Sequence, residues 1–205
     1  MTAEQKVQVF KKELSYIESP LVKTFTEDML ADAPEYFFVI PASSTGKYHP
    51  DYALGEGGLV RHTKAAALIG NILRTINPCR LEPLDLDCAI AAIILHDTRK
   101  CGITDEFSLP HTRFDHPKLA AYAVRNNFEI IDKCYPYDSI GFTREECLDI
   151  HERIASMIES HMGQWNTSKY SPGITLNVPS DPSQFFVHMC DYLASRKEID
   201  IKNLF

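Results

Sequence analysis

The stretch Cys88-Ala-Ile-Ala-Ala-Ile-Ile-Leu-His-Asp97 decides the fold of this chain. Its residues up to Leu95 are all apolar, and an unbroken apolar run is typical of a helix that is buried on every side. The run ends on an adjacent imidazole and carboxylate, His96 and Asp97. Burying unpaired polar groups costs on the order of several kcal/mol. We therefore interpret metal coordination as the most economical reason for this pair.

Other ligand-type side chains occur before and after the pair. His62 and His161 each lie on or at the end of the apolar stripe of an expected helix, as His96 does. One such histidine is more often a satisfied core residue, but three that point inward can meet, and without a metal each would need a hydrogen-bond partner. The candidate metal ligands are His62, His96, Asp97, His116, His161 and Asp191.

The ligand types restrict the metal. Imidazole and carboxylate ligands without thiolate favour Mn, Fe, Co, Ni or Zn over Ca or Mg. A structural zinc site is normally closed by four ligands that include Cys, whereas the six cysteines here form no Cys-x-x-Cys pair. More than four candidates suggest two divalent metals. Asp97 is the natural bridge, since one carboxylate can join two ions roughly 3.5–4 Å apart with a shared water between them.

Composition and charge exclude several classes of protein. The chain has 205 residues, enough for one sizeable core. Its net charge of −7 argues against a protein that coats long duplex nucleic acid, but a small anionic substrate at a metal stays possible. The first residues lack a signal-peptide pattern, and no apolar run approaches the roughly 20 residues that span a bilayer. We expect a cytoplasmic protein without a membrane partner, whose scattered cysteines are small buried hydrophobes.

Helical patterns dominate the chain. Apolar spacing predicts a first amphipathic helix over 7–17 and a second from Pro20, followed by a turn-rich loop over 41–58. No strand alternation occurs, and residues 165–180 form a polar loop that can hold a short hairpin. An all-α single domain is the consistent interpretation. The remaining helices are predicted over 59–76 and 84–97, from Pro117, after the Thr143–Glu146 capping box and from Asp181–Pro182.

The order His…His-Asp…His…His…Asp resembles the HD superfamily of metal-dependent phosphohydrolases, in particular the subset that binds two metals. The segment from Gly57 to Thr63 is similar to the Gly-Gly-Leu-x-x-His-Thr opening of that family. The pair His96-Asp97 followed by Lys100 matches the signature dipeptide with its downstream lysine. The segment from Asp191 to Arg196 resembles the closing aspartate segment.

The region upstream adds to the resemblance. Pro41-Ala42 followed by His49 resembles the lead-in of HD domains from bacterial 3′–5′ exoribonucleases and relaxase-associated HD proteins. The resemblance covers roughly Pro41 to Arg196. It implies an HD-type helical bundle around a central metal site, with 41–205 as the phosphohydrolase domain. Residues 1–40 would be N-terminal helices packed on that domain as part of one structural unit.

The resemblance also assigns roles to residues. It implies His62, His96, Asp97 and Asp191 on one metal, and Asp97, His116 and His161 on the second. Asp97 and Lys100 are the catalytic candidates, and Lys100 would contact the substrate phosphate. The substrate-binding candidates are Lys100, Arg99, Lys47, His49 and Arg196.

Several positions depart from the family pattern or stay open. Arg99 stands where the family has Gly, and it either adds a phosphate contact or projects to solvent. The Gly-Tyr-Pro motif of cyclic-di-GMP phosphodiesterases does not follow His116, which argues against that substrate. His111 is a rival of His116, which matches the family spacing better. We expect His151 and His188 to be structural, and His188, one turn from Asp191, could orient that carboxylate.

The expected function is hydrolysis of a phosphoester bond by a metal-bridging hydroxide. The partner would be a small phosphorylated substrate, such as a nucleotide or a short oligonucleotide. Two alternatives remain: a non-catalytic nucleotide-binding HD module, and a di-iron HD-type oxygenase. The presence of all six ligand candidates argues against the first alternative, and Lys100 argues against the second. The Ser43–Lys47 loop lacks the spacing of a P-loop, which argues against that type of triphosphatase.

Overall fold

Helix α5 (Pro83–Leu95) lies at the centre of the computed structural model, which describes residues 1–43, 49–106, 108–134 and 142–199. All of its residues from Leu86 to Leu95 are buried. Four other helices pack on it, namely α3 (Pro20–Ala31), α4 (Gly58–Ile76), α8 (Arg144–Ser160) and α9 (Pro182–Ala194). This enclosure is the physical reason for an apolar run without a polar face.

The N-terminal third differs in one detail from the prediction. The expected helix over 7–17 is two short helices, α1 (Ala3–Val9) and α2 (Lys11–Leu14), which are separated at Phe10. The Phe10 N–H bonds to the Val7 carbonyl in a tight turn, and its buried ring stacks on Phe37 at 5.9 Å. The helix is therefore broken where an aromatic side chain enters the core. Two 3-10 helices follow α3, η1 (Glu35–Phe38) and η2 (Asp51–Ala53).

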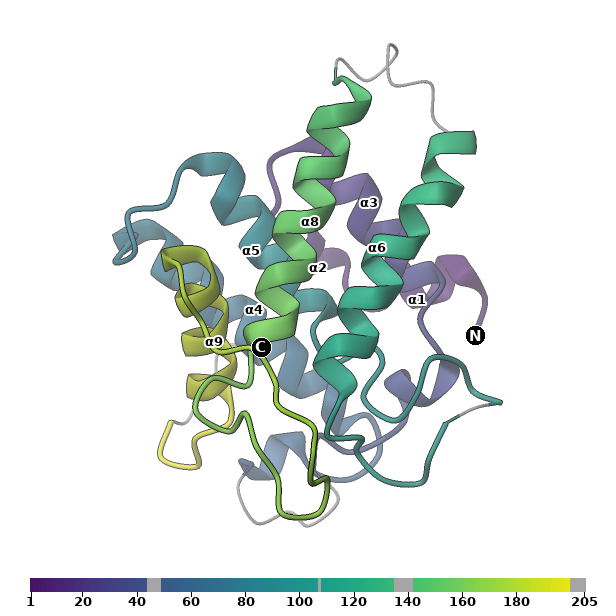
Figure 1. Cartoon of the computed structure of the whole chain (residues 1–205), viewed down its shortest axis with the longest axis vertical. Helices are drawn as coiled ribbons and strands as arrows, with labels where there is room; N and C mark the ends of the chain where they lie inside the picture. Colours follow the sequence, from purple (N-terminus) through teal and green to yellow (C-terminus); the bar gives the residue numbers. More distant parts are fainter. Residues whose placement is uncertain (44–48, 107, 135–141, 200–205) are drawn as a thin grey trace.

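The longer helices confirm the all-α prediction. Helix α6 (His116–Cys134) packs along α8, and the two stand side by side in Figure 1. Helix α8 opens with the predicted capping box of Thr143 and Glu146, and α9 opens with Asp181 as its cap. The described residues contain no β-strand, and only an isolated bridge joins Thr167 to Thr175. The fold is one helical domain.

Helix α5 ends two residues earlier than the expected helix over 84–97. Its last residue is Leu95, His96 is the C-cap, and Asp97 lies in the following turn. The Asp97 carbonyl still accepts a hydrogen bond from the Lys100 N–H, which tightens this turn. The imidazole and the carboxylate therefore emerge from the end of the buried helix, where other helix ends can meet them.

Two glycines determine where α4 begins, and therefore where His62 lies. Gly57 has a φ of 68°, a left-handed conformation that favours glycine. A Cβ on Gly58 would lie 2.2 Å from the Ala53 carbonyl oxygen and 3.1 Å from the Pro41 Cα. The backbone of η2 can pack this closely only against glycine. The Gly-Gly pair thus places the first turn of α4, and His62 follows one turn later.

One hydrophobic core joins the N-terminal helices to the rest of the bundle. Phe25 and Met29 of α3 belong to the same buried cluster as residues of α4, α5, α8 and α9. Cys88 and Cys190 are buried in this cluster and carry free thiols. Of the helices in the described ranges, none combines the length and apolar character needed to cross a membrane.

Candidate metal centre

Five helices bring the six predicted ligands together. Four imidazoles and one carboxylate are almost completely buried, and the Asp191 side chain is 20% exposed. His62 lies in the second turn of α4, and His96 and Asp97 lie at the end of α5. His116 begins α6, His161 follows the end of α8, and Asp191 lies in the last turn of α9. Helices from most of the chain therefore converge on one point.

Three of the histidines make the same hydrogen bond to their own backbone. Each places Nδ1 within hydrogen-bond distance of the carbonyl three residues earlier: His96 to Ile93 at 2.6 Å, His116 to Arg113 at 2.7 Å, and His161 to Ile158 at 2.7 Å. A carbonyl oxygen only accepts, so Nδ1 carries the proton in each ring. In the neutral ring Nε2 then presents a lone pair, which is the form that binds a metal.

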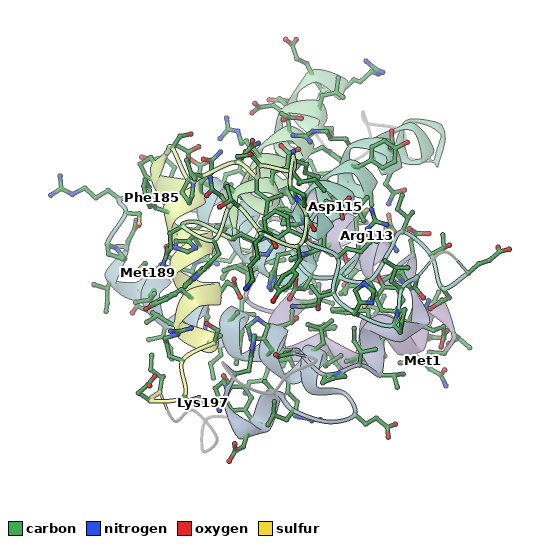
Figure 2. All side chains as sticks on the ribbon, turned by 60° about the horizontal axis from the view of Figure 1, so that its bottom comes forward. Met1, Arg113, Asp115, Phe185, Met189 and Lys197 are labelled. Atoms are coloured by element: carbon green, nitrogen blue, oxygen red, sulfur yellow. The ribbon has the colours of Figure 1, made fainter. Side chains whose placement is uncertain are left out.

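The turn before α6 fixes the His116 ring. Arg113, whose carbonyl accepts from His116, binds Asp115 through two hydrogen bonds of 2.9 and 2.7 Å. Figure 2 shows the Arg113 and Asp115 side chains next to each other. This paired arrangement is geometrically specific for a guanidinium and a carboxylate. It holds the carbonyl that orients the imidazole.

A first group of ligand atoms consists of His62, His96 and Asp191. His62 Nε2 lies 2.9 Å from Asp191 Oδ1, and His96 Nε2 lies 3.5 Å from the same oxygen. One ligand atom from each of the three residues lies within 4.8 Å of the others. We call this set the α9 group, because Asp191 of α9 joins its members.

A second group surrounds Asp97. Asp97 Oδ1 lies 3.0 Å from His116 Nε2 and 3.9 Å from His161 Nε2. The two Nε2 atoms are 3.2 Å apart. We call Asp97, His116 and His161 the α6 group. Asp97 Oδ2 faces the other way, 3.4 Å from His96 Nε2, so the carboxylate lies between the two groups.

The donor set fits divalent transition metals. Two donors about 2.0–2.2 Å from one ion lie roughly 3.0–3.5 Å apart at octahedral or tetrahedral angles, which matches most of these separations. His96 Nε2 and Asp97 Oδ1 are buried and have no hydrogen-bond partner among the described residues. The Nε2 atoms of His116 and His161 also lie 3.2 Å apart, and Nδ1 of each ring already faces a backbone carbonyl. A bound cation would satisfy the buried atoms that lack partners.

The protonation states favour cation binding. Burial and the neighbouring His96 and His116 lower the pKa of His161 to about 3, so this ring is neutral at neutral pH. Burial disfavours the Asp97 carboxylate, but Lys100 and His96 outweigh it and hold the pKa of Asp97 well below its usual value. Burial likewise disfavours the Asp191 carboxylate, but the hydrogen bond from His62 and the nearby His96 outweigh it and hold the pKa of Asp191 well below its usual value. Both carboxylates are therefore ionised.

Five of the six ligands, all except His96, line a cavity of about 550 Å³, which lies within the range of small-molecule sites. Three predicted substrate-binding residues, Lys100, His49 and Arg196, line it. Lys100 is buried and donates to Asp97 Oδ2 at 2.5 Å. The His49 ring lies 5.1 Å from the His62 ring, centroid to centroid. Lys47, another predicted contact, lies outside the described residues.

Arg99 is placed away from the cavity. Its guanidinium donates to the Asp32 carbonyl at 3.2 Å, to the Ile103 carbonyl at 3.1 Å and to Asp32 Oδ2 at 2.5 Å. The residue is 2% exposed, so it projects neither to solvent nor into the cavity. The expected phosphate contact is therefore wrong for Arg99. Its partners are the Asp32 carboxylate and the carbonyls of Asp32 and Ile103.

The remaining histidines have structural surroundings or lie at the surface. His151 packs edge-on against Phe25 at 4.1 Å, as expected of a core residue. His188 does not reach Asp191 but lies 2.7 Å through Nδ1 from the His161 carbonyl, so the proposed orienting role is corrected. His111 is exposed and does not line the cavity.

Sequence reasoning missed two aromatic residues at this site. Trp165 lines the cavity, and its ring stacks on Tyr192 with centroids 5.5 Å apart. The available signal was their position, because Trp165 follows His161 by four residues and Tyr192 follows Asp191 directly. A residue beside a ligand in sequence can share its cavity, whichever residue type it is.

The all-α bundle brings imidazoles and carboxylates together in groups that could hold a metal ion. Comparison with protein-family models finds the HD domain over residues 59–196, well over half of the chain. The chain therefore belongs to the HD domain family, a superfamily of metal-dependent phosphohydrolases. Neither the search of curated proteins nor the search of solved structures found a match.

Proposed function

We propose that the protein hydrolyses a phosphoester bond of a nucleotide or short oligonucleotide, using two divalent transition-metal ions. The observation that carries this proposal is the convergence of imidazole Nε2 atoms and ionised carboxylates beside a cavity that Lys100 also lines. This combination can hold cations and receive a phosphate in the same space. A purely structural metal site would be closed by its ligands.

The proposed ligand sets follow the family resemblance and the two groups. His62, His96 and Asp191 of the α9 group would hold one ion together with Asp97. Asp97, His116 and His161 of the α6 group would hold the other. The two oxygens of Asp97 face different groups, which supports a bridging role for this carboxylate. When bound, the ions would polarise the phosphate and lower the pKa of water toward neutrality.

Residues of the cavity would bind and orient the substrate. The Lys100 ammonium, beside Asp97, would contact a phosphate oxygen and offset charge that develops in the transition state. Burial and the nearby His62 and Lys100 lower the pKa of His49 to about 3, so His49 would meet the substrate as a neutral ring. In the reaction the oxygen of water bonds to phosphorus, the ester P–O bond breaks, and a proton passes to the leaving alkoxide.

A metal-supplemented substrate screen tests the proposal. The metal-free protein would be loaded separately with Mn, Fe(II), Co, Ni or Zn. The substrates would be bis-p-nitrophenyl phosphate, p-nitrophenyl phosphate, nucleoside mono- and triphosphates, and a short labelled single strand. We expect metal-dependent release of p-nitrophenolate, of phosphate, pyrophosphate or triphosphate, or of a shortened strand from at least one substrate. Failure to hydrolyse any of them would contradict the proposal and favour a nucleotide-binding module, and oxygen uptake by the ferrous protein would favour an oxygenase.

The placement of Arg99 gives a second prediction. Arg99→Lys retains the charge but cannot keep all three hydrogen bonds to Asp32 and Ile103. We expect the free energy of unfolding to fall by about 1.5–3 kcal/mol, the range for hydrogen bonds to charged groups. The hydrolysis rate per metal-loaded molecule should be unchanged. Urea unfolding and steady-state kinetics check this, and a loss of rate without a loss of stability would restore Arg99 as a substrate contact.

A further inference from the structure

Trp165, Tyr192 and Arg196 form a stacked surface on the cavity, which we call the aromatic wall. The Trp165 and Tyr192 rings are nearly parallel, with an interplanar angle of 20°. The Arg196 guanidinium lies 4.5 Å from the Tyr192 ring centroid and 5.9 Å from that of Trp165. Trp165 and Arg196 both line the cavity that contains the candidate metal ligands. The wall therefore borders the same space in which phosphate would bind.

The backbone holds Trp165 in place. Gly163 has a φ of 57°, and a Cβ at this position would lie 2.2 Å from the His188 ring. His188 Nδ1 lies 2.7 Å from the His161 carbonyl, and Nε2 lies 3.2 Å from Gln164 Oε1. The turn after α8 is thus clamped to α9 by one imidazole. A preorganised aromatic side chain pays less conformational entropy when a ligand binds.

Trp165 is unusual for its exposure. It is the one tryptophan in the sequence and is 42% exposed, although it lines a cavity whose other walls include buried ligands. Tyr192 stacks on the indole, which itself lines the cavity. A large indole left open beside a charged centre suits a ligand that carries both an aromatic ring and a phosphate.

We propose that the aromatic wall binds the heterocyclic base of a nucleotide, which stacks on the Trp165 indole while its phosphate lies at the metal centre. This inference rests on the proposed function and adds the surface that would recognise the base of a nucleoside phosphate, or of the terminal nucleotide of a short strand, and so distinguish it from a phosphorylated sugar. Stacking needs only a flat ring, so the wall selects for a base without choosing which base. The Arg196 guanidinium adds donors and positive charge beside the stacked base.

Tryptophan fluorescence tests base binding without hydrolysis. Because Trp165 is the sole tryptophan, indole emission reports on the wall alone. The metal-free full chain would be titrated with AMP and, separately, with ribose 5-phosphate. We expect saturable quenching by AMP and no change with ribose 5-phosphate. Equal quenching by both compounds, or none by AMP, would overturn the proposal even if the protein proves to be a phosphohydrolase.

Kinetics provide a second test with matched variants. For Trp165→Leu, the kcat/KM ratio of AMP over ribose 5-phosphate should fall about 5- to 150-fold, the range expected from stacking of one base. Trp165→Phe should retain most of that ratio. Tyr170→Leu, at an aromatic residue that is 83% exposed outside the cavity, is the control and should leave it unchanged. The Phe variant keeps the test valid if the Leu variant fails to fold.

The two tests separate the two claims. If the wild type hydrolyses phosphoesters but Trp165→Leu leaves the ratio unchanged, the wall does not bind the base and the proposed function stands. If the wild type hydrolyses neither compound, the fluorescence titration alone decides whether the wall binds a base. Quenching by AMP in that case would support a nucleotide-binding role of the wall.

Discussion

Asp97→Asn should reduce hydrolysis of every substrate of the wild type by more than about a thousandfold, because metal ions contribute several kcal/mol of transition-state stabilisation. Asp97 faces the α9 group through one oxygen and the α6 group through the other. A neutral amide removes the negative charge that both groups share. It also leaves the Lys100 ammonium without its carboxylate partner in the cavity.

A matched control separates this effect from general damage. Asp149 is an exposed carboxylate of α8 that pairs with Arg153. Asp149→Asn changes the same functional group far from the cavity and should retain wild-type activity. Circular dichroism establishes that both variants are folded. An Asp97→Asn protein that is folded and as active as the control would remove Asp97 from the mechanism.

Metal removal should lower the thermal midpoint of unfolding by several degrees. In the metal-free protein the Nε2 atoms of His116 and His161 lie 3.2 Å apart, and buried atoms of His96 and Asp97 lack hydrogen-bond partners among the described residues. Metal at a hundred times its dissociation constant stabilises a folded protein by about 2.7 kcal/mol. For a chain of this length that corresponds to a shift of about 5–10 °C.

Differential scanning calorimetry with and without MnCl2 measures this shift. The metal-free protein would be prepared with a chelator that is then removed by dialysis. The Asp149→Asn control should respond to manganese as the wild type does, and Asp97→Asn should respond much less. Identical midpoints for metal-free and manganese-saturated wild type would show that the buried imidazoles form a structural cluster with no metal-binding energy.

The elements that carry the centre could be predicted because their signals are local. The apolar run of α5 shows directly that the helix is buried, and the Thr143–Glu146 capping box marks a helix start without any tertiary information. The His96-Asp97 pair could be recognised because two polar residues follow directly on an apolar run. These features depend on residues within a few positions of one another.

The predictions were wrong where residues distant in sequence determine the position of a side chain or the end of a helix. The Arg99 guanidinium is oriented by its hydrogen bond to Asp32, which lies 67 positions earlier. No residue next to Arg99 in the sequence indicates this partner. His188 looked like a partner of Asp191 one turn away, yet the turn after α8 places the His161 carbonyl nearer. At the break between α1 and α2, the Phe10 ring stacks on Phe37, which is also distant in sequence. Tertiary packing overrides local patterns in each of these cases.

Elemental analysis of the dialysed, metal-loaded protein tests the central claim most directly. After loading with manganese, the wild type should retain two ions per chain, one for the α9 group and one for the α6 group. Asp97→Asn should retain fewer than one, because both groups lose the carboxylate that lies between them. A wild-type protein that retains no transition metal, or an Asp97→Asn protein that retains two ions, would contradict the two-metal account.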